Sequence, residues 1–441
     1  MSEVQCVRPE AYSQPENHDE AYWPTRHGAE RFMEYPGRGK ACYALVSPRQ
    51  HFGYATALIL PLLGTGPRVK KMPALTLSPA LSVLAALTRF TPPQPLHTFL
   101  RTTGYKIRPP RPLPYSPLKS PARDAILEHS PAGPHRLATL LCEKRPGPAP
   151  TIVLGGFVPD ATEQVFLIRG FLLKHGSVYY LNYPRTGFSL DLLCAQLDDL
   201  VEEINTLHGQ RPVLFGVSFG AGLLLEWLRR ARVAGRSPAL AGTVLISPVA
   251  CTADIVAPDE VKPTTLLGRA LKPFLDAEAG QVAPGIIEKS RVIFTKMFEA
   301  GAQNKSSLRA LMTGAELRHL HTHVIEAIQS VDFTGACERL AALRQLPVLS
   351  AWDGGPRPLS DAPALILYAE KEGSVLHERS PTRAALGTTL SAFFPLGTHH
   401  IVKGGSSPVQ HASLIFHYFQ FLPPITAFYR GLKTHTVSRA A

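Results

Sequence analysis

The sequence predicts an α/β fold built on a doubly wound, mostly parallel sheet with helices on both faces. Short apolar runs alternate with amphipathic helical segments between about residues 150 and 250, which is typical of such a sheet. A stretch without strand patterns follows, and the strand pattern resumes near residue 364. The pentapeptide at residues 216–220, of the form G-x-S-x-G, lies between an apolar run and a helical segment inside this alternation.

The composition allows a large folded core and argues against nucleic-acid binding. The 441 residues are 45% hydrophobic, and this length predicts two or three structural units. The net charge of +12 comes from dispersed basic residues rather than from a basic motif interleaved with aromatic residues, so we expect no nucleic-acid partner. The six cysteines lack C-x-x-C spacing, so we expect reduced thiols and a cytoplasmic location. The polar, then acidic N-terminus is unlike a secretory signal.

The first part of the chain is expected to lie outside this core. We expect residues 1–105 to form a partly disordered, partly helical N-terminal extension, and residues 106–122 a Pro-rich linker in extended polyproline geometry. Residues 73–87 are the most apolar stretch of the extension, but a proline and several polar residues interrupt it. It is therefore too short to span a membrane, and we expect a buried or interfacial helix there. Peripheral membrane contact stays open.

The elements of the core are expected in two parts. A turn cluster at residues 131–134 separates two short apolar segments, 125–128 and 137–142, and predicts a hairpin. The rest of the first core part, residues 123–252, is expected to alternate strands with helices. The strands are expected at 151–154, 178–183, 212–215 and 242–247, and the helices at 163–174, 190–207 and 221–230.

A helical insertion is expected at residues 253–362, where strand patterns are absent. An insertion between two strands of a doubly wound sheet usually lies over the carboxyl ends of the strands, where such sheets bind ligands, so we expect a cap over the substrate. The second core part is expected at residues 363–425 and a C-terminal tail at 426–441. Helices are expected at 264–274, 286–300, 306–312 and 324–329, strands at 364–369 and 390–394, and a last helix at 408–421.

The pentapeptide has the form of a nucleophile elbow. Gly216 and Gly220 remove the side chains that would collide in so tight a turn between strand and helix. The turn would lift the hydroxyl of Ser218 above the sheet, where a base can reach it. A glycine-rich turn without a catalytic role is the simpler alternative, so a base, an acid and oxyanion donors must be found elsewhere in the chain.

With this elbow and this order of elements, residues from about 125 to 422 resemble the α/β-hydrolase superfamily, in particular its serine esterases and lipases with a helical cap. The resemblance implies a catalytic triad in the order serine, acid, histidine, each in the loop after a strand. Serine at the elbow argues against the dehalogenase and epoxide-hydrolase members, which carry aspartate there. No phosphate-binding glycine loop is present, so we expect no cofactor.

The resemblance places the base at His399. The run Gly397-Thr398-His399-His400 follows the expected strand 390–394 and precedes the expected last helix, which is where the superfamily histidine falls. The common form of the motif is Gly-His, so Thr398 is a departure from it. The neighbouring His400 is the alternative base.

The acid is expected at Glu372. The segment 370–375 resembles the family's Gly-x-x-Asp-x-x-Val, with glutamate in place of aspartate. Glu370 is a near competitor. Some relatives place the acid after the preceding strand of the sheet, so Asp254 is the alternative acid.

Two backbone N–H groups are expected to form an oxyanion hole. Phe219 follows the nucleophile directly and would donate one of them. Phe157 would donate the other, because Gly155-Gly156-Phe157 follows an expected strand and matches the family's His-Gly-x with glycine for histidine.

No metal site is expected. His319 and His323 share a face of an expected helix while His321 points away, and no carboxylate is placed to complete a ligand set.

The sequence therefore predicts a serine hydrolase that cleaves a carboxylic ester or a related acyl compound through an acyl-enzyme intermediate. An acyltransferase would use the same triad. A catalytically inactive binding or scaffold protein is the third reading, supported by the departures at Gly155, Thr398 and Glu372. An apolar cap and a basic chain favour a small-molecule acyl substrate that is lipid-like or anionic. The sequence indicates no oligomeric state.

Overall fold

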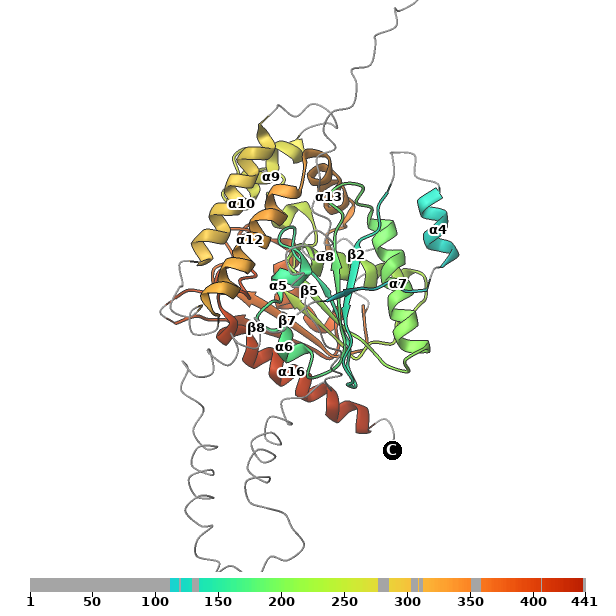
Figure 1. The fold of residues 1–441 in the computed structure, drawn as a ribbon. Coiled ribbons are helices and arrows are strands. Elements are labelled where there is room, and N and C mark those ends of the chain that lie inside the picture. The colour runs from blue at the N-terminus through green and yellow to red at the C-terminus, as the bar shows by residue number, and fades with distance from the viewer. Residues whose placement is uncertain are drawn as a thin grey trace, which may run out of the picture. The chain divides into compact units, whose positions relative to one another are not determined.

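A sheet with the strand order β1-β2-β4-β3-β5-β6-β7-β8 organises the described part of the chain (Figure 1). The computed structural model describes residues 112–438 except 119, 129–134, 277–284, 303–307, 309–311, 350–357 and 406. Strand β2 runs antiparallel to β1 and β4, and all pairs from β4 to β8 are parallel. The strands are β1 (Leu113–Pro114), β2 (Thr139–Glu143), β3 (Thr151–Leu154), β4 (Val178–Asn182), β5 (Val213–Val217), β6 (Gly242–Ile246), β7 (Ala364–Ala369) and β8 (Gly397–Val402).

This sheet confirms the predicted doubly wound, mostly parallel architecture. Every residue of β3 to β7 is buried, which explains why these strands read as continuous apolar runs rather than as an alternation. Strand β8 pairs only with β7 among the described strands, and several of its side chains are exposed.

Helices cover both faces of the sheet. Successive strand residues point to opposite faces, so Ile152 joins the apolar core under α7 and α8, while Val153 joins the core under α5, α6 and α16. The helices outside the insertion are α4 (Pro121–Glu128), α5 (Ala161–Gln164), α6 (Arg169–Leu172), α7 (Leu190–Thr206), α8 (Phe219–Val233), α14 (Pro381–Thr388), α15 (Leu390–Phe393) and α16 (Tyr418–Ser438).

A helical insertion separates β6 from β7, as predicted, and its helices gather beyond one end of the sheet in Figure 1. Apolar side chains of α10 and α12 pack on one another and on Phe416 of the core. The expected helix 306–312 lies mostly outside the described residues. The insertion contains the short 3-10 helix η3 (Thr252–Asp254) and the helices α9 (Leu266–Asp276), α10 (Ile286–Ala302), α12 (Gly314–Ser330) and α13 (Phe333–Gln345).

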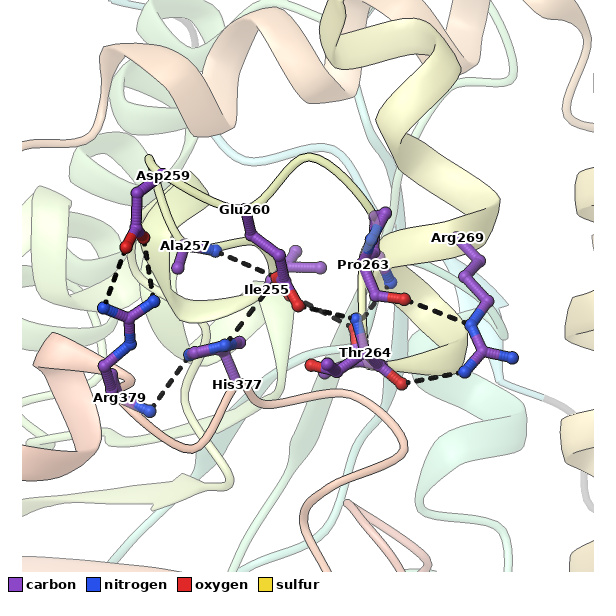
Figure 2. Close-up of polar contacts among 11 residues, drawn as sticks. Ile255, Ala257, Asp259, Glu260, Pro263, Thr264, Arg269, His377 and Arg379 are labelled. Atoms are coloured by element: carbon purple, nitrogen blue, oxygen red, sulfur yellow. Dashed lines mark hydrogen bonds and ion pairs between the residues drawn. The ribbon is translucent and has the colours of Figure 1, made fainter.

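Polar contacts tie the beginning of the insertion to the segment that follows β7 (Figure 2). Asp259 and Arg379 form a two-pronged ion pair with distances of 2.8 and 3.2 Å. His377 lies beside this pair, and its Nε2 atom is 3.7 Å from a carboxylate oxygen of Glu260. The backbone N–H of Leu267 donates to the carbonyl oxygen of Ser374 at 3.0 Å.

Four local predictions were wrong. The expected helix 163–174 is two short helices, α5 and α6, separated by a turn at residues 165–168. Residues 121–128 form helix α4 and not a hairpin strand, because Pro121 stands at the first helical position and the buried Arg123 pairs with Asp199 of α7. The expected strand 390–394 is the short helix α15, and the last strand of the sheet is β8. The expected last helix begins only at Tyr418 and continues to Ser438 as α16, into the residues expected to be a tail.

Other predictions fall on undescribed residues. The apolar stretch 73–87, the rest of the N-terminal extension and the linker up to residue 111 lie outside the described part of the chain. Within the described residues, no helix has both the length and the apolar character needed to cross a membrane.

Candidate active site

Ser218 stands at the sharp turn between β5 and α8. Its φ of 52° lies in the left-handed region that side-chain-bearing residues seldom adopt, so the turn is strained. A Cβ atom on Gly216 would lie 2.6 Å from the Cα atom of Ala221, and one on Gly220 would lie 2.3 Å from the carbonyl oxygen of Gly155. Both glycines are thus required by the space in the turn, as the sequence predicted.

A chain of hydrogen bonds leads from Ser218 to a buried carboxylate. The hydroxyl oxygen of Ser218 lies 2.9 Å from Nε2 of His411, and Nδ1 of His411 lies 2.5 Å from Oε2 of Glu372. Ser218 follows β5, Glu372 follows β7 and His411 follows β8, so the parallel strands bring the three residues to the same edge of the sheet.

Glu372 is held in its ionised form by its surroundings. Its second oxygen, Oε1, accepts hydrogen bonds from the hydroxyl of Ser247 at 2.7 Å and from the backbone N–H of Ala369 at 2.6 Å. Burial alone would raise the pKa of Glu372, but His411 and these donors outweigh burial and hold the pKa below its ordinary value. A carboxylate of this kind can orient an imidazole and stabilise its charged form.

The structure does not bring His399 to Ser218, which corrects the predicted position of the histidine. His399 lies on β8, opposite Ile366 of β7, with its ring 5.6 Å from the ring of Tyr368. His400, the alternative, is also on this strand and is exposed. Partial burial, together with His400 and Arg383, lowers the pKa of His399. The histidine that contacts Ser218 still follows the last strand of the sheet, as the family order implies. That strand is β8 and not the expected strand 390–394.

The loop that carries His411 is fastened to the loop after β7. Glu370, considered above as a competing acid, accepts hydrogen bonds from the backbone N–H groups of Gly404 and Val409 at 2.7 and 2.8 Å. Lys371 donates its N–H to the carbonyl oxygen of Val409 at 3.0 Å. Glu370 therefore positions the histidine loop, and no histidine of the described residues contacts its carboxylate.

Asp254, the alternative acid, is fully buried at the start of the insertion. Its carboxylate accepts hydrogen bonds from the N–H groups of Ala250 and Thr382, at 2.8 and 3.0 Å, and from the hydroxyl of Ser380 at 2.6 Å. These contacts join the loop after β6 to helix α14. Within the described residues, no histidine side chain contacts this carboxylate, so the structure does not bring Asp254 into the chain that leads to Ser218.

Of the two predicted oxyanion donors, Phe219 follows Ser218 directly at the start of α8, and Phe157 lies in the loop after β3. The rings of Phe157 and Phe219 are 5.5 Å apart, and a Cβ atom on Gly156 would lie 3.6 Å from that of Ser218. In the described part of the chain, neither the N–H of Phe157 nor that of Phe219 has a hydrogen-bond acceptor. Both N–H groups can therefore donate a further hydrogen bond.

A cavity of about 370 Å³ opens on Ser218 and His411 beneath the helical insertion. None of its described lining residues is Asp, Glu, Lys or Arg, and most are apolar. Its polar lining side chains, apart from Ser218 and His411, are Gln164, Ser374, Gln410 and Ser413, and its apolar walls include Leu266, Leu267, Phe294, Met297, Phe298, Val324, Ile328, Ile415 and Phe416.

The histidines of α12 contact one another and a ring of α10. The rings of His319 and His323 are 4.2 Å apart, and His321 packs against Phe298. Among the described residues, no group of three or more histidine, cysteine or acidic side chains is arranged to hold a metal ion.

Comparison with known proteins gives one family match. A model described as "Alpha/beta hydrolase family" matches residues 156–416. No curated protein sequence matches the chain.

Solved structures resemble the chain at low sequence identity. A thermophilic esterase from Thermogutta terrifontis has 15% identity and a TM-score of 0.43, with 67% of this chain and 94% of that chain covered. An epoxide hydrolase mutant from Bacillus megaterium has 12% identity and a TM-score of 0.45, with 66% and 97% covered. A membrane phospholipase A described as a bacterial virulence factor has 14% identity and a TM-score of 0.47, with 81% and 98% covered. None of these likenesses bears on substrate or chemistry.

Proposed function

Because the chain belongs to the alpha/beta hydrolase family, we propose that it is a serine hydrolase that cleaves a carboxylic ester or a related acyl compound through an acyl-enzyme. The observation that carries this proposal is the hydrogen-bonded chain from Ser218 through His411 to the buried Glu372. The base lies at hydrogen-bond distance from both the nucleophile and the orienting acid, and the nucleophile and the base border one cavity, which is what acyl transfer to a serine needs.

Each residue has a distinct role in the proposed reaction. The Nδ1–H group of His411 donates a hydrogen bond to the Glu372 carboxylate, which leaves Nε2 free to accept the proton of Ser218 as the hydroxyl oxygen attacks the acyl carbon. The N–H groups of Phe157 and Phe219 donate to the oxygen that becomes negative. His411 then passes the proton to the leaving alcohol, and a water molecule activated by the same histidine releases the acid.

The cavity supports an uncharged, apolar acyl group as the substrate class. A charged acyl group would lose its hydration there without a described lining residue of opposite full charge to pair with. The helical insertion supplies part of the apolar wall through α9, α10 and α12, so we assign it the role of a cap. The anionic acyl substrates considered from the sequence are therefore disfavoured.

The proposal is tested by labelling the full-length protein with a fluorophosphonate probe, which reacts with activated serines. We expect the wild-type protein to be labelled and to hydrolyse p-nitrophenyl butanoate. We expect Ser218→Ala to abolish both activities, and His411→Ala to reduce both by about 10³-fold or more, because the serine loses its base.

His399→Ala is the matched control, because this histidine lies on the adjacent strand β8 and not against Ser218. We expect this variant to keep the wild-type rate. Labelling that survives in His411→Ala but is lost in His399→Ala would reverse the assignment of the base. A folded wild-type protein that takes no label would point instead to an inactive fold with a binding role.

A further inference from the structure

A buried arginine joins the insertion to the two loops beside Ser218. Arg339, in the middle of α13, has a side chain that is only 1% exposed. Its Nη1 atom donates to the carbonyl oxygen of Phe157 at 2.5 Å, and its Nη2 atom donates to that of Pro184 at 3.1 Å. The guanidinium carbon lies 5.7 Å from the ring centroid of Phe157 and 5.5 Å from that of Tyr183. One side chain thus holds the loops after β3 and β4 together.

The charge of Arg339 is poorly compensated for so buried a group. Among the described residues, no carboxylate forms an ion pair with it, and its Nε atom has no hydrogen-bond partner. Burial, with a contribution from Arg185, lowers the pKa of Arg339 to about 10, so the side chain remains a cation at neutral pH. An apolar side chain would dock α13 at lower cost if packing were all that this position required.

Hydrogen bonds to two carbonyl oxygens restrain the peptide unit between Gly156 and Phe157. The carbonyl oxygen of Gly155 accepts a hydrogen bond from the hydroxyl of Tyr183 at 2.9 Å, and that of Phe157 is held by Arg339. These oxygens belong to the peptide units on either side of the Gly156–Phe157 unit. Because peptide units are planar, fixing both neighbours leaves the middle unit little freedom to rotate. The middle unit carries the N–H of Phe157.

We infer that Arg339 is a positioning residue, which aims the N–H of Phe157 at the oxyanion and thereby makes the reaction depend on the docking of helix α13. This inference rests on the proposed function. Arg339 does not line the cavity, so it acts through the loop and not on the substrate. Its cation also adds to the positive potential around the developing negative charge.

Other contacts of α13 indicate that its docking is close. A Cβ atom on Gly335 would lie 1.7 Å from the carbonyl oxygen of Arg185, so the helix touches the loop after β4 directly. Glu338 accepts a hydrogen bond from the N–H of Phe188 in the same loop at 2.9 Å. Glu338 is next to Arg339 in sequence but does not contact the loop that carries Phe157, which makes it a matched control.

The test compares Arg339→Met, Arg339→Lys and Glu338→Ala in the full-length protein. With p-nitrophenyl butanoate, we expect kcat of Arg339→Met to fall about 10²-fold, as when an oxyanion donor is lost, with KM changed by less than about threefold. The rate of labelling by the fluorophosphonate probe should fall in parallel, because its transition state uses the same donors. The pH at which kcat/KM is half-maximal should not move, since the pair of His411 and Glu372 is untouched.

Arg339→Lys keeps the charge but cannot reach both carbonyl oxygens, so we expect a loss of about tenfold in kcat. Glu338→Ala removes one contact of α13 with the loop after β4 but leaves both carbonyl bonds of Arg339 in place, so it should keep the wild-type kcat. Wild-type kcat in Arg339→Met, or an equal loss in Glu338→Ala, would overturn the inference. If the methionine variant does not fold, the lysine variant decides in the same way. A wild-type protein without label or activity would instead refute the proposed function.

Discussion

At the scale of single residues, two residues of the site could be predicted from the sequence and one could not. Ser218 was predictable because the glycines around it are required by the turn, and Glu372 was predictable from its position after a strongly apolar strand. The histidine was not, because the strand before it is weakly apolar. Strand β8 has no continuous apolar pattern, because Thr398, His400 and Ile401 are exposed. The adjacent apolar residues Phe393 and Phe394 predicted a strand, but they lie at the end of a short helix.

The orienting role of the Glu372 carboxylate can be tested by replacing it with an amide. We expect Glu372→Gln to lower kcat for p-nitrophenyl butanoate by about 10⁴-fold, because the amide favours the wrong tautomer of His411. Steady-state kinetics of the purified variant measure this. A variant that keeps more than about a tenth of the activity would contradict the role assigned to Glu372.

The same substitution has a consequence for stability at acid pH. The folded-state pKa of Glu372 lies below its ordinary value of 4.5, so its ionised form stabilises the fold above that pH. This contribution is lost as the pH falls through the folded-state pKa. We therefore expect the Tm advantage of the wild-type protein over Glu372→Gln to be constant between pH 5 and 7 and to shrink below about pH 4.5. An advantage that grows on acidification would contradict the sign of the shift.

At the scale of elements, the buried parallel strands were predictable and the edges of the sheet were not. Strands β3 to β7 are covered on both faces, so their sequences are apolar throughout and stand out. Helix α4 was missed because its tertiary contact, the buried pair of Arg123 and Asp199, is not visible in a local pattern. The contact of α13 with the loop that carries Phe157 joins residues 182 positions apart and has no local signal either.

Helix α10 offers a test of how an element shapes the cavity. A Cβ atom on Gly301 would lie 2.3 Å from the ring of Phe416, which lines the cavity. We expect Gly301→Ala to push this ring and narrow the cavity, so kcat/KM for p-nitrophenyl octanoate should fall more than that for the acetate ester. Rates over a series of p-nitrophenyl esters measure this change.

Gly387→Ala in α14 is the control, since a Cβ atom there would meet nothing within 4 Å. It should leave the ester preference unchanged and increase the free energy of unfolding by up to about 1 kcal/mol, as alanine does in a helix. An unchanged ester preference in Gly301→Ala would show that α10 does not limit the acyl group.

At the scale of the whole described unit, some contacts between the insertion and the core are exposed ion pairs and others are buried apolar contacts. The ion pair of Asp259 and Arg379 in Figure 2 is exposed to solvent, whereas Leu267 and Phe274 of α9 are buried in the main apolar core. Exposed pairs contribute little because water and salt screen them. Apolar burial and the buried hydrogen bonds therefore hold the insertion in place.

Arg379→Ala follows from this comparison. We expect Tm to change by less than about 2 °C and kcat to remain at the wild-type value, because the lost pair is screened. Differential scanning fluorimetry at low and high salt measures the effect. A large loss of Tm at low salt that disappears at high salt would assign the ion pair a greater role.

The short strand β1 has a consequence for the behaviour of the protein at high concentration. Leu113 and Pro114 pair with the outer side of β2, and the N–H of Tyr115 donates to the carbonyl oxygen of Leu140 at 2.9 Å. Without this strand, β2 would offer a row of unpaired backbone groups to any neighbouring chain. Pro114 has no N–H to offer a further strand, so β1 protects this edge against edge-to-edge aggregation.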